Sequence, residues 1–253
     1  MPRFKDQAIC IREIDWSQTS QVVVLLTEQH GKVRGLAKGS KRTSPSSVQR
    51  YSGGVELLTL GQIVATTRPT AELATVTEWD LQNDYYTLRR ELTAQRLGMY
   101  GADLAGALLA DDDPHPGMFA ALRDFLDAIA RTEKAPDHDS AALVRYQWRV
   151  LNDCGYRPEL DRDVRQGGPL KDQSAYSFDP RAGGLTQGSG PAKWRVRRQT
   201  VAVLRGAAGG AAIDRADADS LSGANRLLCV YARAILDQEL PTMQFVLGKG
   251  NLS

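Results

Sequence analysis

Cysteine is scarce in this chain of 253 residues: there are three, and they stand singly. Because Cys10, Cys154 and Cys229 form no close pair, the sequence argues against a disulfide framework and against a thiolate metal site. The N-terminus lacks the apolar core of a signal peptide, and no stretch reaches the roughly 18 uninterrupted apolar residues of a membrane span. We therefore expect a soluble, cytoplasmic protein without a membrane partner.

Aspartate and glutamate are absent from residues 31–50, a stretch that we call the basic segment. The whole chain is nearly neutral, with a formal net charge of +2, so this local excess is not a by-product of a basic composition. An uncompensated cluster indicates a polyanionic partner, although a solvated charged face is the alternative. The candidate DNA-binding residues are Lys32, Arg34, Lys38, Lys41, Arg42 and Arg50.

Short β-branched runs between glycine, serine and proline predict strands up to about residue 80. We expect strands at 8–11, 22–26, 32–37, 55–60, 62–67 and 73–79, with the fourth and fifth paired around Gly61. This number suffices for a small closed barrel of the OB type, with an SH3-like barrel as the alternative. In an alternating strand, Lys32 and Arg34 point to the same face, and the loop at 39–44 can fold around a phosphate backbone.

After Trp79 the apolar period changes to about 3.6, which predicts a long helix up to Leu108. Further helices are expected at 116–131, 140–154, 193–208 and 220–239. Between residues 156 and 192, glycine pairs allow only turns and at most one short hairpin. The fold class is therefore α+β: an OB-fold nucleic-acid-binding domain at 1–80, then a mainly helical domain at 81–253 with an irregular insertion at about 156–192.

Base stacking would require aromatic side chains near the basic segment. The candidates are Phe4, Trp16, Tyr51 and Trp79, and core packing is the alternative for most of them. Tyr51 directly follows Arg50 and is the first to test, whereas Trp79 is expected to seal the barrel against the first long helix. Arg12 and Arg68 are further candidates for the rim of the site.

A second basic cluster lies at the start of the helix predicted from residue 193. Cations gain nothing from the macrodipole at a helix start, so their presence invites a binding explanation. Arg195 and Arg198 would share a helix face and could extend the DNA track or bind an acidic peptide. An exposed amphipathic helix start is the alternative. The cluster consists of Lys193, Arg195, Arg197 and Arg198.

Two acidic clusters could be interpreted as metal sites of a nuclease: Asp111–Asp113 with His115, and Asp137–Asp139. Both directly precede predicted helices, where acidic residues are expected as caps. The sequence 248–250 lacks the upstream glycine and the following Ser or Thr of a phosphate-binding loop. We expect a protein that is not an enzyme, with an RNA-binding barrel as the main alternative and a metal-dependent nuclease as the other.

Four strings, in this order, resemble the RecO family of bacterial recombination mediators. They are residues 31–42 after a β-hairpin, Cys154–Asp161, Phe178–Gly184 and Glu239–Phe245, and the resemblance covers essentially the whole chain. It implies a DNA repair protein, nucleoid-associated in the cytoplasm, that binds single- and double-stranded DNA and anneals complementary strands. The implied partners are RecR, the C-terminal tail of single-stranded DNA-binding protein (SSB) and, indirectly, RecA. Arg145 and Arg149 could flank the apolar notch expected for that tail.

The predicted insertion departs from the family pattern. Many members carry Cys-x-x-Cys twice there, a spacing that holds tetrahedral zinc. In this chain Asp163, Gln166, Gln187 and Gly190 occupy the corresponding places. One carboxylate and two amides cannot replace four thiolates, so we predict no structural zinc, no other cofactor, and a floppier insertion that packing alone holds together.

Overall fold

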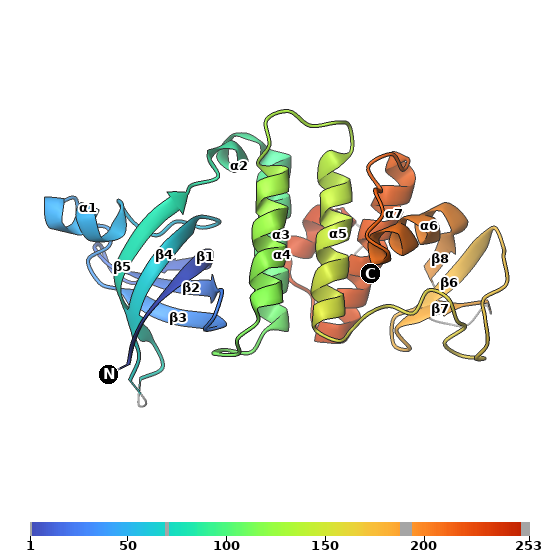
Figure 1. Cartoon of the computed structure of the whole chain (residues 1–253), viewed down its shortest axis with the longest axis horizontal. Coiled ribbons are helices and arrows are strands. Elements are labelled where there is room, and N and C mark those ends of the chain that lie inside the picture. The colour runs from blue at the N-terminus through green and yellow to red at the C-terminus, as the bar shows by residue number, and fades with distance from the viewer. Residues whose placement is uncertain (1, 69–70, 188–193, 249–253) are drawn as a thin grey trace. The chain divides into compact units, whose positions relative to one another are not determined.

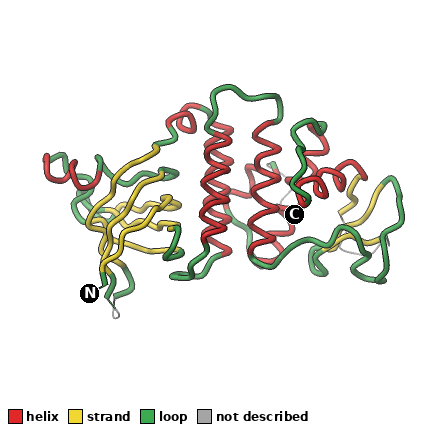
Figure 2. Tube along the Cα trace, in the orientation of Figure 1, coloured by secondary structure: helices red, strands yellow, loops and turns green. Residues whose placement is uncertain are grey.

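The computed structural model describes residues 2–68, 71–187 and 194–248 of the chain. It forms two compact units, Met1–Ala130 and Arg131–Ser253. Figure 2 separates the strands, in yellow, from the helices, in red. No helix in the described part of the chain is long and apolar enough to cross a membrane.

The first unit begins with a closed barrel (Figure 1). The order around the ring is β1-β2-β3-β5-β4, with β4 pairing back to β1 and with β3 and β5 parallel. This ring confirms the predicted OB-like barrel. Its strands are β1 (Arg3–Asp15), β2 (Gln21–Thr27), β3 (Lys32–Ala37), β4 (Leu60–Thr66) and β5 (Ala74–Asn83).

Alternating apolar side chains fill the ring, and Trp79 is the largest of them, with 1% of its surface exposed. The ring of Trp79 lies so close to β4 that a Cβ at Gly61 would sit 2.6 Å from it. Gly61 therefore serves a close approach inside β4 and not a turn. The strand pair that we predicted around Gly61 is wrong, because residues 55–59 form a loop before a single strand.

Helix α1 (Pro45–Tyr51) follows the loop at 39–44, and the sequence analysis did not predict it. Proline at its first turn fits the helix start, since the missing N–H would have no partner there. Tyr51 ends the helix and is 2% exposed. Its hydroxyl donates hydrogen bonds to the carbonyls of Val76 at 3.0 Å and of Lys38 at 3.2 Å. The helix is thus fastened to the barrel through a buried tyrosine.

Three helices complete the first unit: α2 (Tyr86–Arg90), α3 (Leu92–Leu108) and α4 (Pro116–Ile129). α3 and α4 pack on each other and on the outer face of β1, where a Cβ at Gly106 would lie 3.2 Å from Ile11. The long helix predicted directly after Trp79 is wrong at its start. β5 continues to Asn83, and Tyr85 takes a left-handed φ of 44° before α2 begins. The first unit therefore holds these helices as well as the barrel, and the domain boundary near residue 80 stays a prediction.

The second unit is mostly helical. α5 (His138–Asp153), α6 (Arg198–Ala208) and α7 (Ala218–Leu236) pack together, followed by a 3-10 turn, η1 (Pro241–Met243), and α8 (Gln244–Leu247). Gly155, with a φ of 80°, follows α5 as predicted. The insertion contains a small sheet of β6 (Ala175–Asp179), β7 (Gly184–Thr186) and β8 (Trp194–Arg197) in the order β7-β6-β8. A barrel followed by helices with a small sheet confirms the predicted class.

Candidate nucleic-acid interface

The basic segment lies on β3, on the loop that follows it and on α1. β3 alternates as predicted: Arg34 points outward, whereas Val33 and Ala37 are buried. Three more cations stand in the loop at 38–42, which we call the cationic loop, and a fourth is on α1. All four of these residues are exposed: Lys38, Lys41, Arg42 and Arg50.

Lys32 is the exception within the basic segment. Its ammonium donates hydrogen bonds to the carbonyls of Gly106, at 2.8 Å, and Leu109, at 2.6 Å, at the end of α3. Asp111 pairs with the same ammonium at 3.1 Å, and 16% of the lysine side chain is exposed. A cation at a helix C-terminus satisfies carbonyls that lack an intrahelical partner. Lys32 therefore joins β3 to α3, and we remove it from the DNA-binding set.

We expect Lys32→Met to destabilise the first unit by about 1–3 kcal/mol, because it leaves two carbonyls without their charged donor. The salt dependence of DNA binding should stay unchanged. Arg34→Met, on the same face of β3, is the matched control and should do the reverse: little change in stability, and a decrease of about one in the salt slope. Urea unfolding and a salt titration of DNA affinity measure both quantities. A loss of salt dependence in Lys32→Met would return this residue to the DNA surface.

Hydrogen bonds fasten the cationic loop to the turn between β1 and β2. The backbone N–H of Lys41 donates to the carbonyl of Thr19 at 3.2 Å, and that of Gly39 donates to Ser20 Oγ at 3.2 Å. The Lys41 ammonium also pairs with Asp15, whose side chain is 73% exposed. The two loops are therefore joined, and the exposed carboxylate of Asp15 competes with a phosphate for Lys41.

Arg12 and Arg34 lie on either side of Val24 in the barrel register. Neighbouring strands are about 4.8 Å apart, so the two arginines stand roughly 10 Å from each other at their Cα atoms. Arg12 is 64% exposed and lies 3.7 Å from Asp103. Arg68 is exposed in the segment after β4. Within the ranges that the structure describes, Arg34, Lys38 and Arg42 form no ion pair.

The structure separates the aromatic candidates. Tyr51, the last residue of α1, is buried, so the prediction that it stacks on a base is wrong. The guanidinium carbon of Arg50 lies 5.8 Å from the centroid of its ring. Trp79 fills the interior of the barrel and does not seal it against a helix, which corrects the second expectation. Phe4 stacks on His30 with their ring centroids 4.1 Å apart. Trp16, in contrast, is 66% exposed.

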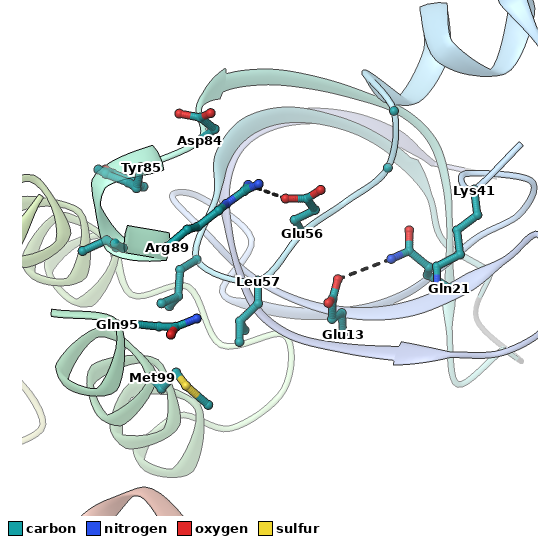
Figure 3. A pocket seen from close by; sticks show the side chains of 14 residues that line it. Glu13, Gln21, Lys41, Glu56, Leu57, Asp84, Tyr85, Arg89, Gln95 and Met99 are labelled. Atoms are coloured by element: carbon teal, nitrogen blue, oxygen red, sulfur yellow. Dashed lines mark hydrogen bonds and ion pairs between the residues drawn. The ribbon is translucent and has the colours of Figure 1, made fainter. Parts of the chain in front are cut away.

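A hollow of about 450 Å³ opens beside the cationic loop (Figure 3). Arg89, from α2, pairs with Glu56 across it, and the amide of Gln21 lies 3.3 Å from Glu13. Desolvation at this wall raises the pKa of Glu13, and repulsion from Glu56 adds to the shift. Lys41 lines the same hollow. Cations and carboxylates therefore compensate each other inside the hollow. The other exposed cations of the basic segment, Arg34, Lys38, Arg42 and Arg50, are not part of its lining.

Two residues of the acidic clusters, Asp111 and Asp139, have cationic partners. Asp111 pairs with Lys32 as described, and Asp137 takes the N-cap position of α5 without a side-chain cap hydrogen bond. Asp139 lies in the first turn of α5 and pairs with Lys134 at 3.1 Å. Among the described residues, no group of three or more His, Cys, Asp or Glu side chains could hold a metal ion. The described residues therefore offer no set of metal ligands for the nuclease alternative.

Most of the second basic cluster precedes the helix, because α6 begins at Arg198, five residues later than predicted, with Arg197 as its N-cap residue. Trp194–Arg197 is the strand β8, so Arg195 and Arg197 share a face while Val196 between them is buried. Arg197 lies 3.6 Å from Asp219, and Arg198 lies 3.1 Å from Asp172. Lys193 falls outside the described residues. The prediction that Arg195 and Arg198 share a helix face is therefore wrong. Acidic residues compensate the charges of Arg197 and Arg198.

Asp163, at the first zinc-ligand position, is a hydrogen-bond centre of the insertion. One carboxylate oxygen accepts the backbone N–H groups of Arg165 and Gln166, each at 2.9 Å. The other accepts the N–H of Gln187 at 2.8 Å and the hydroxyl of Thr186 at 3.2 Å. Burial acts to raise the pKa of Asp163, but these donors outweigh it and hold the pKa below its usual range. Polar cross-links thus add to packing within the insertion; Gly190 lies outside the described residues.

A larger hollow of about 690 Å³ lies in the second unit, beside Trp148. Its apolar lining includes Trp148, Pro158 and Leu160. Its charged lining consists of Arg157, Arg162 and Arg205 together with Glu159 and Asp161. Arg205 pairs with Asp161 at 3.0 Å. By comparison, Arg145 is held by an ion pair with Asp214, and Arg149 is half-buried.

Comparison with known proteins follows the same division of the chain. The family model described as recombination protein O, N terminal, matches residues 1–85, and the model described as recombination protein O, C terminal, matches residues 89–247. A DNA repair protein RecO of Anaeromyxobacter sp. (strain K) is 30% identical over 192 residues, which cover 76% of this chain and 72% of that protein. A DNA repair protein RecO of Myxococcus xanthus is 27% identical over 170 residues, which cover 66% and 65%.

Proposed function

Because the chain belongs to the recombination protein O (RecO) family of non-enzymatic DNA repair and recombination proteins, we propose that its barrel binds single- and double-stranded DNA and anneals complementary strands. The observation that carries this proposal is the surface of exposed cations on β3, the cationic loop and α1. Its members are Arg34, Lys38, Lys41, Arg42 and Arg50.

Annealing follows from the electrostatics of this surface. Each cation that contacts a phosphate releases a condensed counterion, which favours binding at low salt. Two strands held on one protein also repel each other less, because the cations between them neutralise part of their charge. Phosphate contacts carry no sequence information, so the surface accepts any complementary pair.

We also propose the partners that this function requires: RecR, the tail of SSB and, through them, RecA loaded on gapped DNA. An acidic tail that ends in an apolar residue needs an apolar hollow flanked by arginines. The hollow beside Trp148 is our candidate, because Arg157 and Arg162 are exposed at its rim, although Glu159 and Asp161 line it as well. It is a better candidate than Arg145, whose guanidinium already pairs with Asp214.

The experiment is an annealing assay with complementary oligonucleotides precoated by the cognate SSB. We expect the protein to accelerate pairing, and to do so several-fold less with an SSB that lacks its acidic tail, since mediator recruitment through the tail raises the local concentration. Matched RNA oligonucleotides distinguish the RNA-binding alternative, and incubation with Mg²⁺ or Mn²⁺ should leave the DNA intact. Failure to anneal bare DNA would contradict the proposed function.

A further inference from the structure

Trp16 is the most exposed of the large apolar side chains that the described structure leaves in contact with solvent, at 66%. A tryptophan presents roughly 200 Å² of mainly apolar surface, so leaving it in water forgoes a large burial free energy. Ile14, two residues earlier, is also exposed, at 52%, and neighbouring exposed apolar side chains mark a binding surface more often than an isolated one does.

The loop that carries Trp16 is ordered by its own hydrogen bonds. The backbone N–H groups of Trp16 and Ser17 both donate to the carbonyl of Ser20, at 3.1 and 3.2 Å. Asp15, directly before the ring, pairs with Lys41 of the cationic loop. The backbone at Trp16 is therefore fixed next to the cationic loop.

The barrel register places an apolar row next to a cationic row. Ile14, Val22 and Leu36 face one another across β1, β2 and β3, and 52% of Ile14 is exposed. Two residues further along each strand, about 6.5–7 Å away, lie Arg12, Val24 and Arg34. Trp16 directly follows β1 at the apolar end of this pattern.

We propose that Trp16 stacks on an unpaired base, so that the barrel binds single strands through base contacts that a duplex cannot make. The proposal rests on the DNA-binding function proposed above and names its preferred substrate. Bases in a duplex are covered on both faces by their neighbours, whereas a single strand can place a base on an aromatic ring. The phosphates then lie over the cations.

Charge decides between a polynucleotide and a protein as the occupant. An apolar protein surface would gain from Ile14 and Trp16 but nothing from the flanking Arg34, Lys38 and Arg42, whose charges would lose hydration without a partner. A single strand satisfies both rows along its length, because it carries an apolar base and an anionic phosphate in every repeat. An acidic tail that ends in one apolar residue could occupy the ring only once.

Binding measurements with Trp16→Ala and Trp16→Phe in the full chain test this inference. The probes are an oligo(dT) of about 20 nucleotides, which exceeds one OB-fold site, an abasic strand of the same length, and a duplex. We expect Trp16→Ala to weaken oligo(dT) binding about 10-fold with an unchanged salt slope, while Trp16→Phe retains most of the affinity. Abasic and duplex affinities should not change.

Equal losses for oligo(dT) and for the abasic strand would overturn the stacking assignment. An unchanged oligo(dT) affinity would overturn it as well and would assign the ring to a protein partner. These failures are distinguishable from failure of the proposed function, in which the unmodified protein binds neither oligo(dT) nor the duplex. Because Trp16 contributes no buried core surface, thermal unfolding of both variants should match that of the unmodified protein.

Discussion

Replacing Lys38, Lys41 and Arg42 together by alanine is expected to weaken DNA binding about 100-fold at 0.15 M salt and to lower the slope of log affinity against log salt by two to three. The three side chains lie on one ordered loop and lack a buried structural role. If each contacts a phosphate, each releases close to one counterion on binding, and the affinity difference grows as the salt concentration falls.

The contribution of Lys41 should be the smallest of the three, because Asp15 already pairs with its ammonium. A charge-matched control removes three exposed cations from the second unit: Lys171, Arg181 and Arg215. Fluorescence anisotropy with one labelled oligonucleotide, repeated over a salt series, measures both variants. If the control lowers the slope as much as the loop variant does, the site assignment to the barrel is wrong.

Asp163→Ala is expected to destabilise the insertion by about 2–4 kcal/mol, because several buried donors lose their shared acceptor at once. The affected amides are those of Arg165, Gln166 and Gln187, together with the Thr186 hydroxyl. Urea unfolding gives the stability, and hydrogen exchange at those three amides shows where protection is lost. Asp172→Ala, an exposed acid of the same unit, is the control and should have little effect.

The pH dependence of this stabilisation has a definite sign. The folded-state pKa of Asp163 is lower than the value of about 3.9 in the unfolded chain. The contribution is therefore fully present above about pH 4 and is lost as the pH falls through the lower folded-state pKa. The stability difference between the unmodified protein and Asp163→Asn should shrink over this range. A difference that stays constant down to pH 2 would show that the carboxylate is not the centre of these bonds.

The barrel was predictable because alternation along a strand is a local property of the sequence. On β3, Val33 and Ala37 are two pairs of residues apart and both are buried, whereas Arg34 lies one residue out of this phase and is exposed. The end of the last barrel strand was harder to predict. Leu81 and Tyr85 continue a helical spacing after Trp79, whereas pairing with β4 extends β5 to Asn83. A long-range partner decided between two local patterns.

Residue roles in the candidate site were predictable only in part. Lys32 and Arg34 look equivalent in the sequence, yet the carbonyls that bind Lys32 come from Gly106 and Leu109, more than seventy positions away. Tyr51 looked exposed in a polar segment because the proline-initiated helix α1, which buries it, was not recognised. The charge pattern of residues 31–50 gave no sign of the carbonyls that bind Lys32 or of the burial of Tyr51.

The centre at Asp163 could not have been inferred from side-chain chemistry. A comparison of ligands shows only that a carboxylate cannot replace a thiolate site, whereas the donors that satisfy Asp163 are mostly backbone N–H groups. Every non-proline residue has such a group, so only the fold determines which ones converge.

The order β7-β6-β8 places β8 at an edge of the small sheet, where no other strand of the described residues pairs with its outer side. Such an edge can recruit a strand from another copy of the chain and so nucleate aggregation, and charged side chains are a common protection against this. Arg195 and Arg197 stand on β8 and would repel the same residues of an approaching copy. Because Asp219 lies 3.6 Å from Arg197, Arg195 carries most of this repulsion, which would keep neighbouring molecules apart even where no ligand is bound.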